Sequence, residues 1–290
     1  MRNPVKRVAA IHDLSGFGRA SLTVVIPILS TMGIQTCPLP TSILSTHTGG
    51  FNEFKFVDFT AHMRDDIEHW IELDLKFDSI YSGFLGSREQ MHIVADFIGH
   101  FRKNCEFVVV DPVMGDDGRL YDTYNREMIE EMRGLITHAD IITPNMTEAA
   151  FLLAEDYPLK MEKCAVKDYL KRLSAMGPQI VIVTSMLLDE TNDKTSVIAY
   201  NKGDSRFWKV DCDYVPTHFP GTGDIFASVI VGSMLQGDSL PLALDRAVQF
   251  TSSTIKTTYG YEYPNREGVM LERVLENLKA PVLNHSYKLF

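Results

Sequence analysis

The residues best suited to chemistry are Gly221, Thr222, Gly223 and Asp224, which stand directly before the apolar run Ile225–Leu235. Glycines on both sides of Thr222 let backbone N–H groups converge, and the N-terminus of the expected helix adds partial positive charge. Such a turn can stabilise charge that develops on a transferred phosphoryl group. The Asp224 carboxylate would lie at the same place, where it suits a general base for an alcohol. The alternative is that Asp224 only caps the helix.

A second acidic segment, DPVMGDDG at positions 111–118, follows the apolar run Phe107–Val110. Asp111 ends a predicted buried strand, where an unpaired charge is costly, so it needs a cation, a helix terminus or a cluster of donors. The glycines predict a loop that moves as a closing flap does. The alternative is an acidic turn in which Asp111 caps backbone groups. Asp117 is interpreted as a solvated residue.

The segment TPNMTE at positions 143–148 also follows a predicted strand. Pro144 at a helix start and Glu148 in the first turn fit ordinary helix capping. A functional role is favoured only because three polar groups follow a strand at the same edge of the sheet. Asn145 and Glu148 could place a water-bound Mg²⁺, an ion that prefers oxygen ligands.

Two glycine-containing loops complete the set of candidates, STHTGG at 45–50 and GFG at 16–18. The first offers hydroxyls and the His47 imidazole as the wall of a pocket for a polar aromatic ring. The second imitates half of a dinucleotide fingerprint, but Ser21 holds the third glycine position and no acidic residue follows near the end of the second strand. We therefore reject a nicotinamide site, although this loop can approach a substrate closely. A P-loop, an HExxH motif and a GxSxG elbow are also absent from the sequence.

The elements that must position these residues alternate between short β-branched runs and helical patterns. Strands are predicted at 5–11, 34–39, 79–82, 107–110, 140–142 and 179–183, an antiparallel pair at 195–200 and 206–210, and helices at 19–32, 58–73, 88–103, 126–137, 147–154, 166–175, 224–235, 240–257 and 268–278. Continuous apolar strands between helices imply an α/β fold, a three-layer α/β/α sandwich with a mostly parallel central sheet. No linker divides the chain, which predicts a single domain over 1–290. Ligands of such sheets sit beyond the carboxyl ends of the strands, where the candidate loops lie.

Composition narrows the class of protein. The chain has 290 residues, 45% of them hydrophobic, and a net charge of −10, which argues against a general nucleic-acid binder. Its four cysteines are far apart and are predicted to be reduced thiols. The N-terminus lacks the features of a signal peptide, and the apolar run at 225–235 is too short to span a bilayer. We expect a soluble cytoplasmic protein that binds neither nucleic acid nor membrane.

In their order along the chain, these motifs resemble the ribokinase-like superfamily, and within it the vitamin B6 kinases (pyridoxal or pyridoxamine kinases). The resemblance runs from Arg7 to about Thr257 and is carried by STHTGG, SGFLGS, DPVMGDDGRLY, TPNMTEA, VIVTS and PGTGDIFAS. It implies a ribokinase-like fold and ATP-dependent phosphorylation of the 5′-hydroxymethyl group of a B6 vitamer. It also implies Mg²⁺, activation by K⁺ and a homodimer.

The resemblance further implies a role for each matching residue. Asp224 matches the general base, and Gly221, Thr222 and Gly223 match the anion hole. The residues that match nucleotide contacts are Asp111, Asp116, Tyr121, Thr143, Asn145, Thr184 and Ser185. The metal would be served by Glu148, Asp111 and Asn145, and the vitamer by Asp13, Ser15, His47, Thr48 and Phe84.

Two positions depart from the B6 kinase pattern. Asp13 stands where these kinases often have a Ser that touches the pyridine, and Phe84 stands where they often have a Tyr. The run HDLSG at 12–16 is also similar to the hydroxymethylpyrimidine kinases of thiamine biosynthesis, which are the alternative function. A non-enzymatic sensor of vitamers or nucleotides is a further alternative, and the intact Asp224 motif argues against it.

Overall fold

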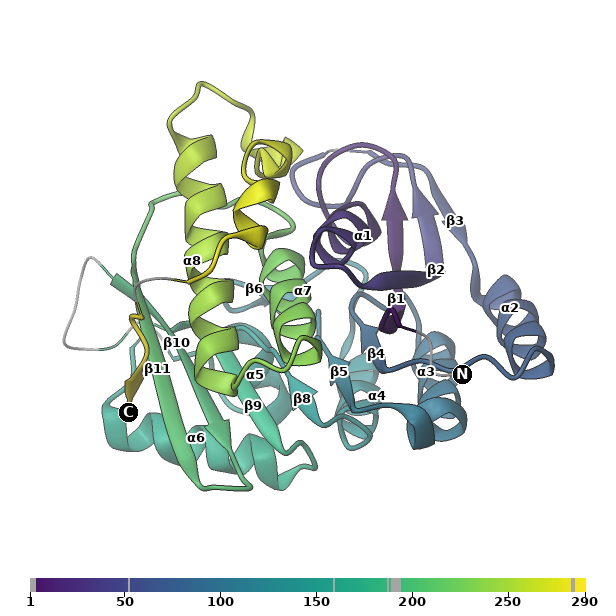
Figure 1. Ribbon diagram of the computed structural model, residues 1–290, viewed down its shortest axis with the longest axis horizontal. Coiled ribbons are helices and arrows are strands. Elements are labelled where there is room, and N and C mark those ends of the chain that lie inside the picture. The colour runs from purple at the N-terminus through teal and green to yellow at the C-terminus, as the bar shows by residue number, and fades with distance from the viewer. Residues whose placement is uncertain (1–3, 52, 159, 187, 189–193, 283–284) are drawn as a thin grey trace.

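A computed structural model describes residues 4–51, 53–158, 160–186, 188, 194–282 and 285–290 of the chain (Figure 1). The strands are β1 (Arg7–Ser15), β2 (Gln35–Leu44), β3 (Phe56–Asp58), β4 (Ser79–Ser82), β5 (Phe107–Val110), β6 (Gly115–Asp116), β7 (Arg119–Leu120), β8 (Ile141–Ile142), β9 (Ile180–Met186), β10 (Lys194–Asn201), β11 (Arg206–Asp213) and β12 (Lys288–Leu289). The α-helices are α1 (Leu22–Thr31), α2 (Thr60–Glu72), α3 (Arg88–Phe101), α4 (Arg126–Ile136), α5 (Met146–Leu153), α6 (Lys163–Ala175), α7 (Thr222–Leu235) and α8 (Leu240–Tyr259). Short 3₁₀ segments cover Arg102–Asn104, Asn265–Glu267, Leu271–Arg273 and Leu275–Lys279.

The main sheet has the strand order β12-β11-β10-β9-β8-β5-β4-β1-β2-β3. From β9 through β2 all neighbours pair in parallel, whereas β3 and the strands β10 to β12 are antiparallel additions at the two edges. The chain passes from β1 to β2 on one side and then returns to β4 on the other side. The order of strands therefore reverses at β1, and ligands of open α/β sheets bind at such a switch point.

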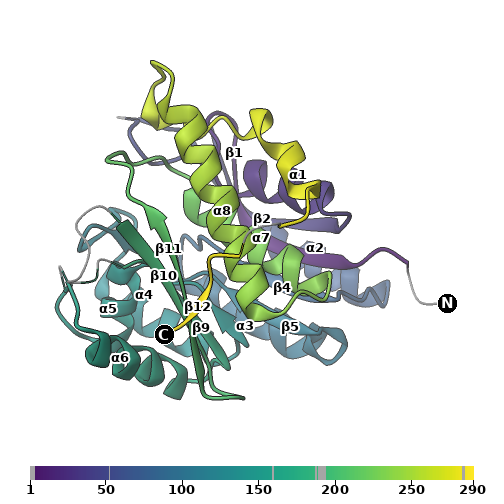
Figure 2. The same cartoon turned by 60° about the vertical axis from the view of Figure 1, so that its left-hand side comes forward.

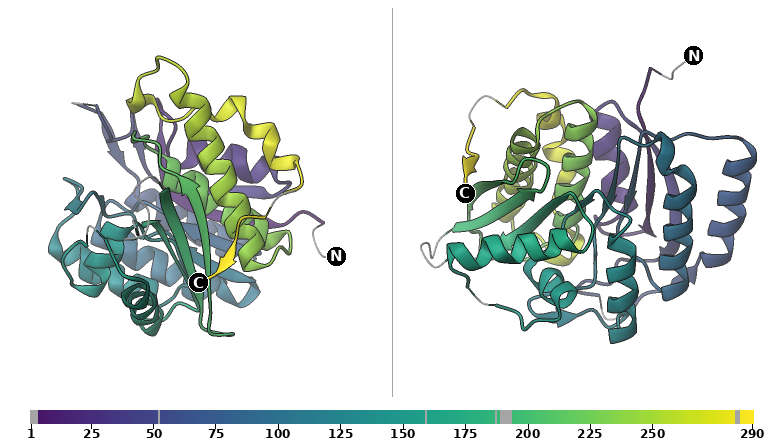
Figure 3. Two further views of the ribbon diagram at one scale, coloured as in Figure 1. Left: turned by 90° about the vertical axis from the view of Figure 1, so that its left-hand side faces the viewer. Right: turned by 90° about the horizontal axis from the view of Figure 1, so that it is seen from below.

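Helices cover both faces of this sheet, as Figure 2 and the two views of Figure 3 show. One buried cluster joins the sheet to α2, α3, α4, α5 and α6, and the other joins it to α1, α7 and α8. The all-buried strand β5, with the sequence FVVV, contributes alternate residues to the two clusters. The predicted three-layer α/β/α architecture is confirmed.

Local signals explain where several helices begin. The Ser87 hydroxyl accepts from the N–H of Gln90 at the start of α3, and the Asn125 side chain does the same for Met128 at the start of α4. Helix α7 is buried along most of its length because it packs against both α1 and α8 as well as the sheet. Such an apolar helix gains its stability from burial on nearly every side.

One predicted helix is wrong. The segment 268–278 forms separate 3₁₀ turns, although its apolar residues have helical spacing. Gly268 has φ +77°, and the N–H of Met270 is donated to the hydroxyl of Thr258 in α8. Leu271, Val274 and Leu278 are buried against the cluster around α8, so tertiary packing overrides the local pattern.

Strand β1 extends to Ser15 and not only to Ile11, because β2 also continues and pairs Leu14 with Ile43. Polar residues placed in a loop by the sequence pattern therefore lie within the strand. The antiparallel pair predicted around 195–210 is confirmed as β10 and β11. Strands β3, β6, β7 and β12 were not predicted, because short strands carry little pattern. The extent of a single domain over 1–290 stays a prediction.

Among the described helices, none combines the length and the apolar composition that crossing a bilayer requires.

Candidate active site

Chemistry-bearing residues converge at the carboxyl ends of β1, β4, β5 and β8, next to the N-terminus of α7. The close approach of β1 and β4 is visible at Gly83, where a Cβ atom would lie 2.3 Å from Nδ1 of His12. His12 itself is fully buried at the end of β1. A glycine after β4 is thus required by its neighbour, and the switch point holds a buried imidazole.

Asp224 lies in the first turn of α7, two residues after Thr222. One carboxyl oxygen, Oδ2, accepts a hydrogen bond of 2.8 Å from the backbone N–H of Ser21. Its side chain remains 14% exposed, so a ligand can reach it. The residue at the N-cap is Gly221, and no side-chain cap is found for α7 within the described residues. The capping explanation for Asp224 is therefore wrong.

Gly221 begins the backbone cradle and has φ +81°. A Cβ atom at this position would lie 2.1 Å from the carbonyl oxygen of Arg19. The first amides of any helix have no partner within that helix, and here a side-chain cap does not take them. With Gly223 exposed beside them, these amides suit an anion.

Burial raises the pKa of Asp224 to about 7. The N–H of Ser21 opposes this rise, whereas the negative charges of Asp111 and Asp13 add to it. Nδ1 of His12 lies 4.0 Å from Oδ1 of Asp224. Burial lowers the pKa of His12 to about 3, so this imidazole is neutral. The pKa of Asp224 thus lies near neutrality, which suits a general base.

Asp111 lies directly after β5 and is 5% exposed. The hydroxyl of Thr143, which follows β8, donates to its Oδ1 at 2.9 Å. Burial raises the pKa of Asp111 to about 7. The partner that the buried Asp111 requires is thus the Thr143 hydroxyl. This donor is neutral, so it does not compensate the charge of Asp111.

Asn145 and Glu148 form a capping box at the start of α5. The N–H of Glu148 donates to Asn145 Oδ1 at 2.9 Å, and the N–H of Asn145 donates to Glu148 Oε2 at 2.8 Å. The N–H of Met114 reaches Glu148 Oε1. The ordinary helix capping that the sequence predicted at this position is therefore confirmed. Burial, together with the charge of Asp111, raises the pKa of Glu148 well above its usual range, so this carboxyl also lies in an acidic surrounding.

The acidic loop forms a tight hairpin of β6 and β7. Asp117 and Gly118 at its turn both have positive φ, +48° and +75°, as a type I′ turn requires. The hydroxyl of Thr147 accepts from the N–H of Gly118, and the Asn145 amide donates to the carbonyl of Gly115. The hairpin is thus fastened to the start of α5.

Asp116 and Tyr121 belong to this hairpin and its exit. Nδ1 of His218 lies 3.4 Å from a carboxyl oxygen of Asp116. Burial raises the pKa of Asp116, and the charge of His218 opposes that rise. Burial and then the charge of Glu148 raise the pKa of the Tyr121 phenol, which keeps it neutral. The hairpin therefore brings both residues to the same acidic edge.

Thr184 and Ser185 lie within β9. The N–H of Thr184 donates to the carbonyl of Pro144 at 3.0 Å, which places β9 next to the start of α5. Ser185 is exposed and has φ +58°. These residues join the same sheet edge as Thr143 and Asn145.

The STHTGG loop holds His47 firmly. The N–H of Gly49 donates to Nδ1 of His47, and Nε2 lies 2.7 Å from the carbonyl oxygen of Arg266. The neutral tautomer with the proton on Nε2 satisfies both contacts. Both ring nitrogens are thus used by the main chain. Thr48 is exposed beside it, and Phe84 is half-buried with its ring 6.1 Å from that of Tyr124.

Asp13 and Ser15 occupy the end of β1 and are buried. Their side chains contact each other, with Ser15 Oγ 3.1 Å from Asp13 Oδ2. Sequence reasoning missed Ser21, which contacts both Asp13 and Asp224. Its place before an apolar helix resembles an ordinary N-cap, so the sequence carried no signal of this contact. No role was predicted for His12, because a lone histidine in a strand carries no pattern of its own.

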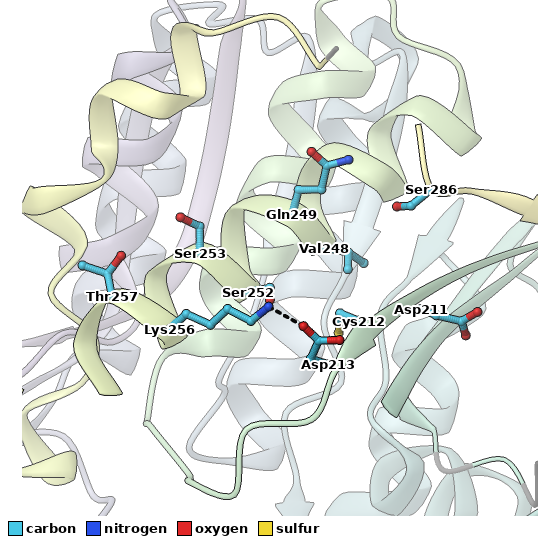
Figure 4. A pocket seen from close by; sticks show the side chains of 10 residues that line it. All are labelled: Asp211, Cys212, Asp213, Val248, Gln249, Ser252, Ser253, Lys256, Thr257 and Ser286. Carbon is cyan, nitrogen blue, oxygen red and sulfur yellow. Dashed lines mark hydrogen bonds and ion pairs between the residues drawn. The ribbon is translucent and has the colours of Figure 1, made fainter. Parts of the chain in front are cut away.

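Two further observations concern metal ligands and a cavity that lies apart from this edge. Among the described residues, no group of three or more His, Cys, Asp or Glu side chains is arranged to hold a metal ion. A cavity of about 420 Å³ lies between β11 and α8, where Lys256 pairs with Asp213 at 2.7 Å (Figure 4). None of the residues assigned above lines this cavity.

A backbone cradle for an anion beside a carboxyl poised to take a proton is what phosphoryl transfer to an alcohol requires, and on this sheet it defines a small-molecule kinase of the ribokinase-like fold. The chain belongs to the phosphomethylpyrimidine kinase family, whose sequence model matches residues 26–268. The predicted relationship to the ribokinase-like B6 kinases is confirmed by the relatives described next.

Solved and curated relatives cover most of the chain. A protein of Bacteroides thetaiotaomicron, provisionally named a phosphomethylpyrimidine kinase and crystallised with pyridoxal, is 55% identical, with a TM-score of 0.95 over 99% of this chain and 100% of its own. The pyridoxal kinase of Lactobacillus plantarum is 29% identical, with a TM-score of 0.87 over 95% of this chain and 97% of its own. The pyridoxal kinase of Arabidopsis thaliana is 27% identical over 263 residues, which is 84% of this chain and 78% of its own.

Proposed function

We propose that the protein transfers the γ-phosphoryl group of ATP to the 5′-hydroxymethyl group of a B6 vitamer, which is pyridoxal, pyridoxamine or pyridoxine. The observation that carries this proposal is Asp224, whose carboxyl is accessible at the mouth of the α7 cradle and has its pKa raised to about 7. The similarity to a protein crystallised with pyridoxal and to pyridoxal kinases supports the choice of ring.

Asp224 would act as general base in a direct in-line transfer. A base with a pKa near the working pH combines the correct protonation state with adequate basicity, and a positioned base contributes roughly 10²- to 10⁴-fold in rate. The amides of Gly221, Thr222 and Gly223 would stabilise the negative charge on the phosphoryl group. Orientation and electrostatics supply most of the remaining acceleration.

Mg²⁺ fits the acidic edge near α5. Asp111 and Glu148 are buried carboxyls that accept hydrogen bonds from neutral donors. A cation beside them would stabilise their charged forms. Since the described residues offer no ready-made cluster of metal ligands, an ion held largely through water and phosphate fits best. Asp111, Asn145 and Glu148 would hold it, and it would neutralise charge on the phosphates. Activation by K⁺ stays a prediction.

The remaining roles follow the sequence resemblance. Nucleotide contacts are assigned to Asp111, Asp116, Tyr121, Thr143, Asn145, Thr184 and Ser185. The vitamer pocket is assigned to His47, Thr48 and Phe84, and both ring nitrogens of His47 are already bonded to the main chain. Asp13 and Ser15 were also predicted to contact the vitamer. The homodimer and the cytoplasmic location stay predictions.

Hydroxymethylpyrimidine kinase is the second candidate. The match to the phosphomethylpyrimidine kinase family and the run HDLSG at 12–16 favour it. Both reactions phosphorylate a hydroxymethyl group on a nitrogen heterocycle, so the same Asp224 chemistry serves either substrate.

A coupled assay of ADP release separates these candidates. Pyridoxal, pyridoxamine, pyridoxine and hydroxymethylpyrimidine are compared at equal concentrations, with Asp224→Asn as the control for the chemistry. We expect the highest kcat/KM with a B6 vitamer. A higher value with hydroxymethylpyrimidine would transfer the assignment to the second candidate, and no ADP release with any of them would favour a sensor.

A further inference from the structure

Ser21 has an unusual backbone conformation for a residue with a side chain. It stands before α1 with φ +52° and ψ −133°, in a region that glycine adopts far more readily. It is 6% exposed, and its side chain does not cap α1. Such a conformation persists only when the surrounding contacts enforce it.

Two contacts of Ser21 join residues from distant parts of the chain. Its N–H donates to Oδ2 of Asp224 at 2.8 Å, and its hydroxyl donates to Oδ1 of Asp13 at 2.5 Å. Asp13 lies at the end of β1 and is 5% exposed. The other oxygen of Asp13 accepts from the hydroxyl of Ser15 at 3.1 Å. Both oxygens of this buried carboxyl are therefore engaged within the protein.

We propose that Asp13 is a positioning residue that holds Ser21 in its strained conformation, so that the Ser21 N–H orients the carboxyl of Asp224 toward the substrate hydroxyl. This inference rests on the proposed function, because it concerns the same base. It assigns Asp13 a task different from the vitamer contact that the family resemblance implies. Ser21, which the sequence did not single out, becomes the link between the two aspartates.

Charge is a second route by which Asp13 acts on Asp224. The groups that face Asp224 are His12 and Asp13 on β1, Tyr81 on β4, Asp111 after β5, and Tyr121 beyond β7. His12 and the two tyrosines are neutral near pH 7, so the charges that act there are those of the acids. The negative charge of Asp13 raises the pKa of Asp224. Replacing Asp13 with Asn should lower that pKa, and the acidic limb of the pH profile should move to lower pH.

The test compares Asp13→Asn, Ser21→Ala and Ser21→Gly with the wild type, and uses Asp66→Asn on the exposed face of α2 as the matched control. We expect Asp13→Asn to lower kcat by roughly tenfold to a hundredfold, as displacement of a catalytic group does, with the KM for the vitamer nearly unchanged. The acidic limb of kcat/KM should move down in pH. Asp66→Asn should match the wild type in all three readouts.

The two Ser21 variants separate backbone conformation from simple loss of a hydroxyl. Ser21→Gly accepts this positive-φ conformation without strain, whereas Ser21→Ala keeps the strain and loses the hydrogen bond that opposes it. We therefore expect Ser21→Gly to retain more activity than Ser21→Ala. Equal losses in both variants would contradict the role of Asp13 in enforcing this conformation.

Other results would overturn the proposal while leaving the proposed function intact. A raised KM for the vitamer with an unchanged kcat would make Asp13 a substrate contact, and wild-type kinetics would give it no role. Failure of the proposed function appears separately, as absence of vitamer turnover in the wild type. In that case, or if Asp13→Asn unfolds in the assay, ¹³C NMR titration of Asp224 in the wild type and Ser21→Ala, with Asp224→Asn to assign the signal, decides the matter. An unchanged pKa of Asp224 in Ser21→Ala would contradict the coupling, because that variant should disturb the contact of the Ser21 N–H with Asp224.

Discussion

Asp224 is surrounded by other acids, and this surrounding sets the pH range in which it can act as a base. Asp111 and Asp13 both raise its pKa, which burial brings to about 7. Burial raises the pKa of Asp111 to about 7 as well. At the residue scale, the site is therefore a group of carboxyls of which several hold protons near neutrality, and this makes distinct predictions for activity and for stability.

Activity should fall on the acidic side of neutrality. Because the base must be deprotonated, kcat/KM should decrease about tenfold per pH unit below the pKa of Asp224 in the free enzyme, near 7. Asp224→Asn should lose roughly 10²- to 10⁴-fold in kcat and still bind ATP, because it keeps the cradle. Steady-state kinetics between pH 5 and 9, with nucleotide binding by calorimetry, measure both. Near-normal turnover in Asp224→Asn would refute the role of base.

Stability should change with pH in the opposite sense. The folded state keeps a proton on Asp111 up to about pH 7, whereas the unfolded chain loses it near the usual value of 3.8, so the free energy of unfolding falls as pH rises between these values. Asp111→Asn removes this effect and should stabilise the ligand-free protein on the order of 4 kcal/mol at pH 8, since the rise from 3.8 to about 7 covers about three pKa units and each is worth about 1.4 kcal/mol. At pH 4 the gain should vanish. Urea unfolding at both values of pH measures it, and an equal gain at both would contradict it.

At the scale of elements, the turn before α7 is the most constrained part of the site. Gly221 has φ +81°, and a Cβ atom there would lie 2.1 Å from the carbonyl oxygen of Arg19. Gly221→Ala should cost at least 1–3 kcal/mol of stability, an order of magnitude typical of backbone strain, and should reduce kcat as well. Gly223→Ala is the matched control, because nothing lies within 4 Å of its Cβ position. Thermal unfolding should separate the two, and equal destabilisation would show that the clash is relieved.

The loop after β1 also rests on the segment beyond α8. Arg19 bonds Glu272 at 2.8 Å and the hydroxyl of Tyr263 at 2.6 Å, and its N–H reaches the carbonyl of Glu267. Arg19→Gln should destabilise the protein by about 1–2 kcal/mol, because hydrogen bonds to charged groups are stronger than neutral ones. Arg64→Gln, which breaks the exposed pair with Glu89, should cost about 0–1 kcal/mol. Urea unfolding compares the two variants. An equal loss of stability would mean that the contacts of Arg19 contribute no more than an exposed ion pair.

At the scale of the whole molecule, the fold could be predicted because a buried parallel strand is a short continuous apolar run, such as 107–110. Such a run can be recognised from the local sequence alone. The acidic loops at the carboxyl ends of those strands were found for the same reason. The contact between Ser21 and Asp224 could not be found, since it joins residues 203 positions apart and depends on backbone conformation. The segment 268–278 was wrongly predicted as a helix because its own residues have helical spacing. The buried surface that prevents a regular helix there belongs to other elements and could not be seen in the local sequence.

Ligand binding should stabilise the molecule as a whole. A ligand that binds only the folded state at a hundred times its Kd adds about 2.7 kcal/mol. We expect ADP with Mg²⁺ to raise the Tm more than ADP with a chelator does, and Glu148→Gln to reduce that difference. Mg²⁺ alone should have little effect, because the described residues hold no ready cluster of ligands. A full Tm shift with Mg²⁺ alone would contradict this arrangement.

The reversal of strand order at β1 has a consequence for how the protein matures. Asp13, Asp111 and Asp224 are brought together only when both halves of the sheet have formed around β1 and α7 has docked on it. Contacts so distant along the chain require the closure of long loops, which slows their formation. Partly folded chains should therefore contain native helices while remaining catalytically silent, and the recovery of turnover during refolding should lag behind the recovery of helical circular dichroism.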